Sequence, residues 1–171
     1  MKKVILSDPT LRDGSHAVKH QLSASQIAGY CRMADAAGIP IVEVGHGNGI
    51  GASSLQLGQA MCSDGQMITT ARDNLHQARL GIHLIPGFAT IQRDLAPALD
   101  LGVDVVRVAT HCTEADTSCR YIEFARRQAA AAYGVLMMSH MASGDELLKQ
   151  ARIMESSGAE YVILMDSAGS Y

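Results

Sequence analysis

Short apolar runs alternate with longer amphipathic stretches along all 171 residues of the chain, and this alternation limits the folds that it can adopt. Six runs are rich in Val, Ile, Leu and Met and show little polar alternation, which is typical of strands buried on both faces. These runs are 4–7, 41–44, 82–85, 105–109, 135–138 and 161–165. Helical patterns separate them, over 25–37, 66–79, 91–101, 115–133 and 144–157. The order predicts an α/β fold with a parallel sheet.

Helix-end signals support these boundaries. Ser23 to Gln26 and Ser143 to Glu146 have the spacing of capping boxes at helix N-termini. Glycines stand after four of the predicted helices, where a C-terminal capping glycine is expected. They are Gly38, Gly102, Gly134 and Gly158.

Two architectures fit this order, the closed (β/α)8 barrel and the open doubly wound sheet. No G-x-G-x-x-G pattern follows the first run, which disfavours a nucleotide-binding sheet. Polar residues follow the C-terminal ends of several successive strands, and such residues converge best in a barrel mouth. A closed barrel needs eight units and about 200 residues or more. We therefore predict one incomplete TIM-type barrel of about six βα units, spanning residues 1–171 as a single domain.

Composition excludes several classes of function. The net charge of −3, the 4% aromatic content and the absence of Trp argue against nucleic-acid binding. No apolar run approaches the ~20 residues of a membrane span, and the N-terminus does not have the pattern of a signal peptide. Four cysteines without a C-x-x-C pair argue against a disulfide framework or a structural zinc site. We expect a cytoplasmic protein.

Three chemically distinct side chains follow the first apolar run within five residues. Arg12 is a planar donor suited to a carboxylate or an enolate. Asp13 is a hard oxygen ligand for a divalent cation. His16 titrates near neutral pH and can move a proton. The grouping indicates an active site; the alternatives are a structural ion pair for Arg12, a turn or capping role for Asp13 and a solvated His16.

The segment Thr10-Leu11-Arg12-Asp13-Gly14-Ser15-His16 resembles the signature of 4-hydroxy-2-oxovalerate aldolases, which belong to the barrel superfamily of hydroxymethylglutaryl-CoA lyase and isopropylmalate synthase. Further matches lie at 42–47, 106–116, 136–141 and 166–169. Three positions depart from the family pattern: Asn48 replaces an Asp, Ala168 replaces a Gly, and His83 replaces an aliphatic residue. The family's His-x-His ligand pair and late Tyr find no counterpart. We interpret the chain as the N-terminal part of one aldolase-type barrel, either a fragment or a naturally short relative.

The resemblance implies a lyase that cleaves 4-hydroxy-2-oxopentanoate to pyruvate and acetaldehyde with a divalent metal. Asp13 would be a metal ligand, and Arg12 would face the substrate carboxylate and the C2 oxygen. His16 would take the C4 hydroxyl proton, and Ser167 would contact substrate unless it caps a helix. The expected metal is Mn²⁺, with Mg²⁺ or Co²⁺ as alternatives. An acylating acetaldehyde dehydrogenase is the expected partner, and aromatic hydrocarbon catabolism is the expected setting.

The remaining candidate residues have simpler interpretations. His46, His111 and His140 follow strand ends and could form a three-histidine metal site, but hydrogen bonding within the barrel rim is favoured. We expect His20 and His76 to lie at the surface. Cys112 is interpreted as a buried structural thiol rather than a nucleophile.

Two other functions stay open. The chain could be another superfamily lyase or synthase acting on an acyl-CoA, although the Ser15-His16 pair after Asp-Gly argues against it. It could also be a non-catalytic barrel with a scaffolding role. An incomplete barrel has open sheet edges with unpaired backbone groups and apolar surface, which favour association with a partner.

Overall fold

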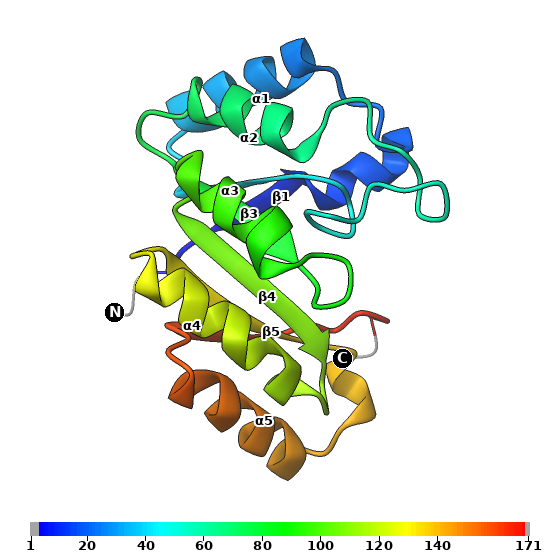
Figure 1. The fold of residues 1–171 in the computed structure, drawn as a ribbon, viewed down its shortest axis with the longest axis vertical. Coiled ribbons are helices and arrows are strands. Elements are labelled where there is room, and N and C mark those ends of the chain that lie inside the picture. Colours follow the sequence, from blue (N-terminus) through cyan, green and yellow to red (C-terminus); the bar gives the residue numbers. More distant parts are fainter. Residues whose placement is uncertain (1–3, 170–171) are drawn as a thin grey trace.

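Six parallel strands form one sheet in sequential order in the computed structural model, which describes residues 4–169. The sheet curls into an incomplete (β/α)8 barrel, as predicted (Figure 1). Its strands are β1 (Ser7–Leu11), β2 (Ile41–Val44), β3 (Arg79–Leu84), β4 (Val105–His111), β5 (Ala131–Met137) and β6 (Tyr161–Leu164).

A helical segment follows each of the first five strands. The α-helices are α1 (Ala24–Ala36), α2 (Asp64–Arg72), α3 (Ala96–Asp100), α4 (Cys119–Arg127) and α5 (Gly144–Ser156). Short 3-10 turns precede α1, α4 and α5 as η1 (Asp13–Val18), η3 (Ala115–Ser118) and η4 (Ser139–Met141), and a π-helical turn, η2 (Ile91–Leu95), leads into α3. Parallel neighbours with intervening helices place the strand C-termini together at one end of the barrel.

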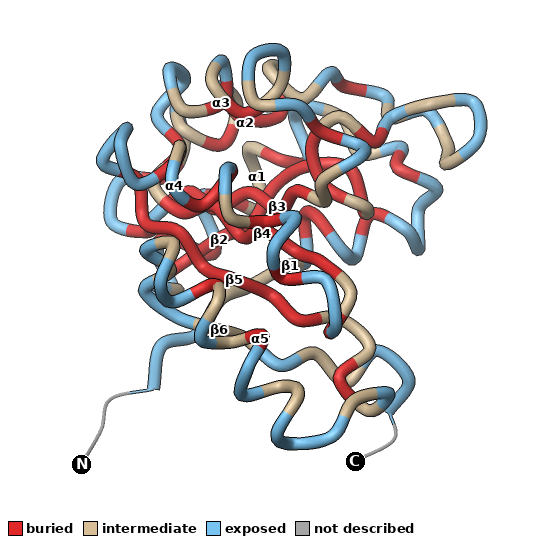
Figure 2. The backbone as a smooth tube through the Cα atoms, turned by 60° about the horizontal axis from the view of Figure 1, so that its bottom comes forward, coloured by how far each residue is buried: buried red, intermediate tan, exposed pale blue. Residues whose placement is uncertain are grey.

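The main hydrophobic core lies between the sheet and these helices. Residues at alternate strand positions, such as Val42, Leu80 and Val106, join helix residues such as Ile27 and Met154 there. Figure 2 shows strands β2 to β5 as mostly buried. A smaller cluster lies on the opposite face of the strands, and it consists of Ile41, Val105, Ala131 and Tyr133 with Ile163 packed against it. The polar residues of the candidate site lie on this second face.

The first strand begins later than the apolar pattern predicted. Ser7 pairs with Ile41, the first residue of β2, so residues 4–6 extend beyond the end of their neighbour. Val4, Ile5 and Leu6 are accordingly exposed. The strand instead continues through Pro9 to Leu11, with a register shift between Asp8 and Leu11. Proline is compatible with this position because β1 is an edge strand.

The segment before β5 also differs from the prediction. The alanine-rich residues 129–132 were expected to continue a helix, but α4 ends at Arg127 and β5 begins at Ala131. Pairing of β5 with β4 overrides the helical propensity of alanine here. Gly134 is therefore a strand residue and not a helix cap. A Cβ atom at Gly134 would stand 2.3 Å from the Met154 sulfur, so α5 packs against this glycine.

The capping signals are largely confirmed. Ser23 and Gln26 form the reciprocal box that starts α1, and Ser143 Oγ accepts the Glu146 N–H at the start of α5. A second reciprocal box, Ser63 with Gln66, starts α2 and was not identified from the sequence. Gly38, Gly102 and Gly158 adopt positive φ after their helices, as expected of C-terminal caps.

The edges of the sheet expose apolar side chains. Tyr161 and Leu164 of β6 are each more than half exposed, as are Val4 and Leu6 before β1. Side chains from both edges, including Ile5, Ser7 and Tyr161, line one cavity of about 260 Å³. No helix within residues 4–169 has the length and hydropathy needed to cross a membrane.

Candidate active site

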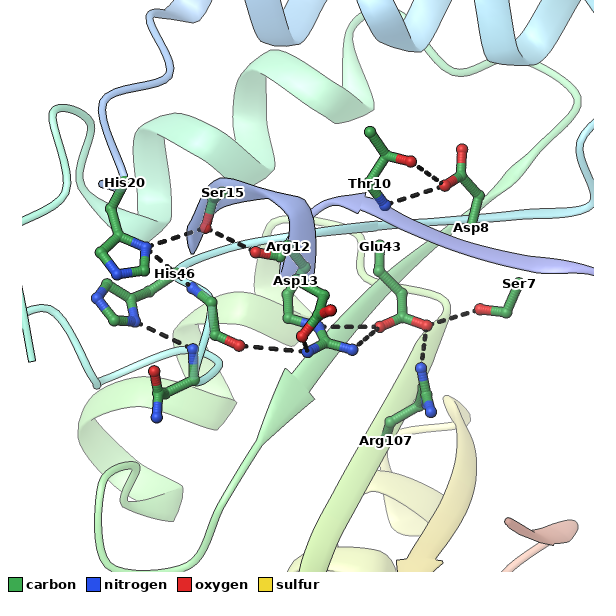
Figure 3. A network of polar contacts seen from close by, with 12 residues as sticks. Ser7, Asp8, Thr10, Arg12, Asp13, Ser15, His20, Glu43, His46 and Arg107 are labelled. Atoms are coloured by element: carbon green, nitrogen blue, oxygen red, sulfur yellow. Dashed lines mark hydrogen bonds and ion pairs between the residues drawn. The ribbon is translucent and has the colours of Figure 1, made fainter. Parts of the chain in front are cut away.

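Arg12 lies at the C-terminal end of β1 and is buried, with 5% of its surface exposed. Its guanidinium donates to Glu43 through Nε and Nη2, both at 3.3 Å, and to Asp13 Oδ1 at 2.9 Å. It also donates to the Gly47 carbonyl at 3.2 Å. Figure 3 shows the guanidinium beside the carboxylates of Glu43 and Asp13. The structural ion pair considered for Arg12 is therefore present, and it fixes the side chain at the mouth of the barrel.

Glu43 is the centre of this network and is completely buried. Besides Arg12, it accepts hydrogen bonds from Ser7 Oγ at 2.7 Å and from Arg107 Nη1. A buried carboxylate is stable only when it is paired and hydrogen-bonded, and here two guanidinium groups and a hydroxyl serve that purpose. Sequence reasoning assigned Glu43 no role. The available signal was a single charge inside the buried run Ile41–Val44 and another inside Val105–Ala109.

Gly81 provides the space for Glu43. Residue 81 pairs directly with Glu43 across β2 and β3. A Cβ atom there would lie 3.2 Å from Glu43 Cγ and from an Ile41 methyl group. Arg107 stands on β4, so the ion pair reaches across β3. Because Gly81 on β3 has no side chain, Glu43 of β2 and Arg107 of β4 can form their ion pair across it.

Asp13 is held close to Arg12 but is open to solvent, with 64% of its side chain exposed. Its Oδ1 accepts from Arg12. Within residues 4–169, no group of three or more His, Cys, Asp or Glu side chains is arranged to hold a metal ion. Asp13 is therefore not part of such a group there, and the three-histidine alternative of His46, His111 and His140 is not formed.

His16 lies on η1 beside two further imidazoles, those of His20 and His46. The ring centroids of His16 and His20 are 4.8 Å apart in an edge-to-face arrangement, and His20 stacks on His46 at 3.7 Å. His20 was expected at the surface, but it is buried at 7% exposure, because the turn after η1 folds it over His46 and Ser15 Oγ lies 3.0 Å from its Nδ1. Burial lowers the pKa of both His20 and His46, which disfavours the charged form of each ring.

The other histidines make separate contacts. His111 Nδ1 lies 2.9 Å from the Thr113 hydroxyl, and His140 Nδ1 lies 3.9 Å from Asp166 Oδ1. The His111 contact agrees with the rim hydrogen bonding favoured from the sequence, whereas the His140 separation is too long for a hydrogen bond. His76 is exposed, as expected. Ser167 Oγ accepts a hydrogen bond from the Met138 N–H at 3.0 Å, which joins the loops after β6 and β5.

His83 stands inside β3 and is 3% exposed. Burial, together with the positive charges of Arg12 and Arg107, lowers the pKa of His83 to about 3. Its Nδ1 has no hydrogen-bond partner among the described residues, and the same is true of Arg107 Nε. Cys112 is fully buried, in agreement with the structural interpretation of that thiol.

An arginine, an exposed carboxylate and a histidine at the open end of a β/α half-barrel form a site at the face where β/α barrels carry their functional residues. Comparison with known proteins agrees, because the family model described as HMGL-like matches residues 3–171. The chain belongs to the HMGL-like family.

Curated relatives narrow the resemblance within that family. The 4-hydroxy-2-oxovalerate aldolase of Spirochaeta aurantia is 62% identical over 168 residues, which are 98% of this chain and 49% of that protein. The protein of the same name from Pectobacterium atrosepticum is 58% identical over 170 residues, which are 99% of this chain and 50% of that protein. The chain spans about half the length of the curated relatives it matches.

Solved structures confirm the fold alone. The carboxyl transferase domain of Rhizobium etli pyruvate carboxylase superposes with a TM-score of 0.78 at 14% identity. The match covers 100% of this chain and 32% of the pyruvate carboxylase chain. The same domain with pyruvate and biocytin gives a TM-score of 0.77, also at 14% identity, with coverage of 100% and 32%.

Proposed function

We propose that this chain carries the Arg12–Asp13–His16 part of a divalent-metal-dependent aldolase that cleaves 4-hydroxy-2-oxopentanoate to pyruvate and acetaldehyde. The observation that supports this most strongly is the fixed guanidinium of Arg12 next to an accessible carboxylate at the barrel mouth. The names of the relatives support the same reaction.

Arg12 would stabilise the charge that develops during cleavage. When the C3–C4 bond breaks, its electron pair moves toward C2, and negative charge collects on the C2 oxygen as an enolate. A guanidinium held by Glu43 and the Gly47 carbonyl is already oriented, so it stabilises that charge without reorganisation in the transition state.

His16 would serve as the base. Cleavage requires removal of the proton from the C4 hydroxyl, after which that oxygen becomes the carbonyl oxygen of acetaldehyde. The His16 ring is exposed at the barrel mouth, so a bound substrate can reach it. The enolate that remains takes a proton at C3 and becomes pyruvate.

Asp13 fits one position in the coordination sphere of a hard divalent cation such as Mn²⁺, Mg²⁺ or Co²⁺. Such ions take about six donors, so substrate oxygens, water and residues beyond those described here would supply the others. A bound cation would add Lewis-acid stabilisation of the C2 oxygen. Ser167, a cytoplasmic setting, an acylating acetaldehyde dehydrogenase partner and a role in aromatic hydrocarbon catabolism stay proposals that follow from the family resemblance.

A coupled assay for pyruvate release tests this function. We expect release from 4-hydroxy-2-oxopentanoate with Mn²⁺, loss of release with EDTA, and no cleavage of an acyl-CoA substrate. Arg12→Ala and His16→Ala should abolish release, and Arg93→Ala should not, because Arg93 is an exposed residue of η2. Unchanged rates in the first two variants would remove both residues from the mechanism.

A scaffolding role is the second candidate, and the exposed apolar residues of both sheet edges favour it. Under that hypothesis the protein would associate with a partner and release no pyruvate under any metal condition. The same assay therefore separates the two functions.

A further inference from the structure

Gly47 is enclosed by the residues proposed for catalysis. Its carbonyl accepts from Arg12 Nη1 at 3.2 Å, and its N–H lies 3.4 Å from His20 Nδ1. Its α-carbon faces His16 so closely that a Cβ atom would stand 2.3 Å from Nε2 and 2.5 Å from two ring carbons. The His16 ring thus occupies the volume in which any side chain at position 47 would lie.

Backbone conformation does not explain this glycine. Gly45 and Gly49 have φ values of +137° and +95°, which favour glycine on conformational grounds. Gly47 is not among the residues with positive φ. An alanine is therefore compatible with the backbone at position 47, and what it would disturb is the His16 ring.

The stacked histidines also pack against that ring. His46 Nδ1 accepts the Asn48 N–H and its Nε2 faces the Gly58 carbonyl, both at 3.1 Å. His20 stacks on His46 with an interplanar angle of 26° and meets the His16 ring edge-to-face. A side chain that is exposed on one side is thereby limited in its rotation, which reduces the entropy lost when it engages a substrate.

We propose that Gly47 and the His20–His46 pair are positioning residues that hold the His16 imidazole at the loop whose Gly47 carbonyl accepts from Arg12. The proposal rests on the proposed function for its catalytic meaning, because His16 is the base of that reaction. Its structural content is independent of activity. It states that the empty α-carbon at position 47 and the stacked pair together determine where the His16 ring lies.

Nuclear Overhauser contacts in the 171-residue chain test the placement directly. We expect contacts from the His16 ring protons to the Gly47 α-protons and to the His20 ring. Gly47→Ala should remove the His16–His20 contact while the rest of the amide spectrum is retained. Gly144→Ala is the matched control, because a Cβ atom there meets nothing within 4 Å and the contact should persist.

A second variant guards against misfolding of Gly47→Ala. His20→Asn keeps a polar atom near the position of Nδ1 but removes the stacked ring, and it should release the His16 ring from Gly47. Absence of the contacts in the unaltered chain would overturn the proposal. So would persistence of the His16–His20 contact in Gly47→Ala together with persistence of the His16–Gly47 contact in His20→Asn.

The kinetic readout separates this proposal from the function on which it rests. In the pyruvate assay, Gly47→Ala should lower kcat by about 10²-fold with little change in KM, because a misplaced catalytic group impairs the chemical step. If the expected contacts are observed but no variant releases pyruvate, the aldolase function is refuted and the placement of the His16 ring still stands. An unchanged kcat with displaced contacts would overturn the positioning role.

Discussion

Replacing Glu43 by Gln tests the buried charge network, because it removes one negative charge and preserves the shape of the side chain. Glu43 is fully buried and accepts from Ser7, from two nitrogens of Arg12 and from Arg107. The substitution removes the counter-charge that Glu43 provides for Arg107 and leaves Arg12 with the exposed Asp13 alone as its ion-pair partner among the described residues. Breaking a buried ion pair by removing one partner costs about 3–5 kcal/mol. That is a large part of the ~5–15 kcal/mol by which domains are usually stable.

Urea unfolding followed by circular dichroism measures this loss. Glu123→Gln is the matched control, since Glu123 pairs with Arg127 at 3.8 Å on α4 and both side chains are more than half exposed. Exposed pairs one helical turn apart contribute about 0.3–0.5 kcal/mol. The reasoning is refuted if Glu43→Gln and Glu123→Gln lower the free energy of unfolding by the same amount.

Three further changes have defined outcomes. His83 has a pKa of about 3 when folded and near 6.5 when unfolded, so the unfolded chain binds more protons between these values and stability falls as pH drops from 6.5 toward 3. His83→Leu should reduce that slope by as much as ~1.4 kcal/mol per pH unit in urea titrations across pH 4 to 6; an unchanged slope would contradict the burial argument. Gly134→Ala should lower the free energy of unfolding by about 1–3 kcal/mol, because the new methyl group collides with Met154. Adding Met154→Ala to the same chain should relieve the collision. If the stability losses of the two substitutions are additive in thermal melts, the contact is disproved. Ala129→Gly should stabilise the fold by about 1 kcal/mol, because Ala129 has φ of +61° after α4, and an unaltered unfolding midpoint would argue against strain there.

The sequence predicted the parallel sheet because buried strands and amphipathic helices have different hydrophobic periods. Ile41–Val44 was placed correctly for that reason, and so was the start of β4 at Val105. The ends of β1 and β5 were misplaced because they depend on the neighbouring strand. Residues 4–6 are apolar but pair with no strand within residues 4–169, and Ala131 is a helix former that pairs with Val105.

In the candidate site too, local groupings of residues could be predicted from the sequence and long-range contacts could not. Arg12, Asp13 and His16 could be grouped from the sequence because they are local to one another. Glu43 could not be assigned a role, since its partner Arg107 is 64 residues away and only the curl of the sheet brings them together. His20 was misjudged because its burial arises from stacking on His46, a contact between two loops.

Binding of Mn²⁺ at Asp13 tests the central claim most directly. Titration of the chain with Mn²⁺ in the presence of pyruvate, followed by electron paramagnetic resonance, measures the bound ion. The account predicts saturable binding that Asp13→Asn abolishes and that Asp145→Asn, an exposed acidic position on α5, leaves unchanged. Equal Mn²⁺ binding by the Asp13→Asn variant and the unaltered chain would contradict it.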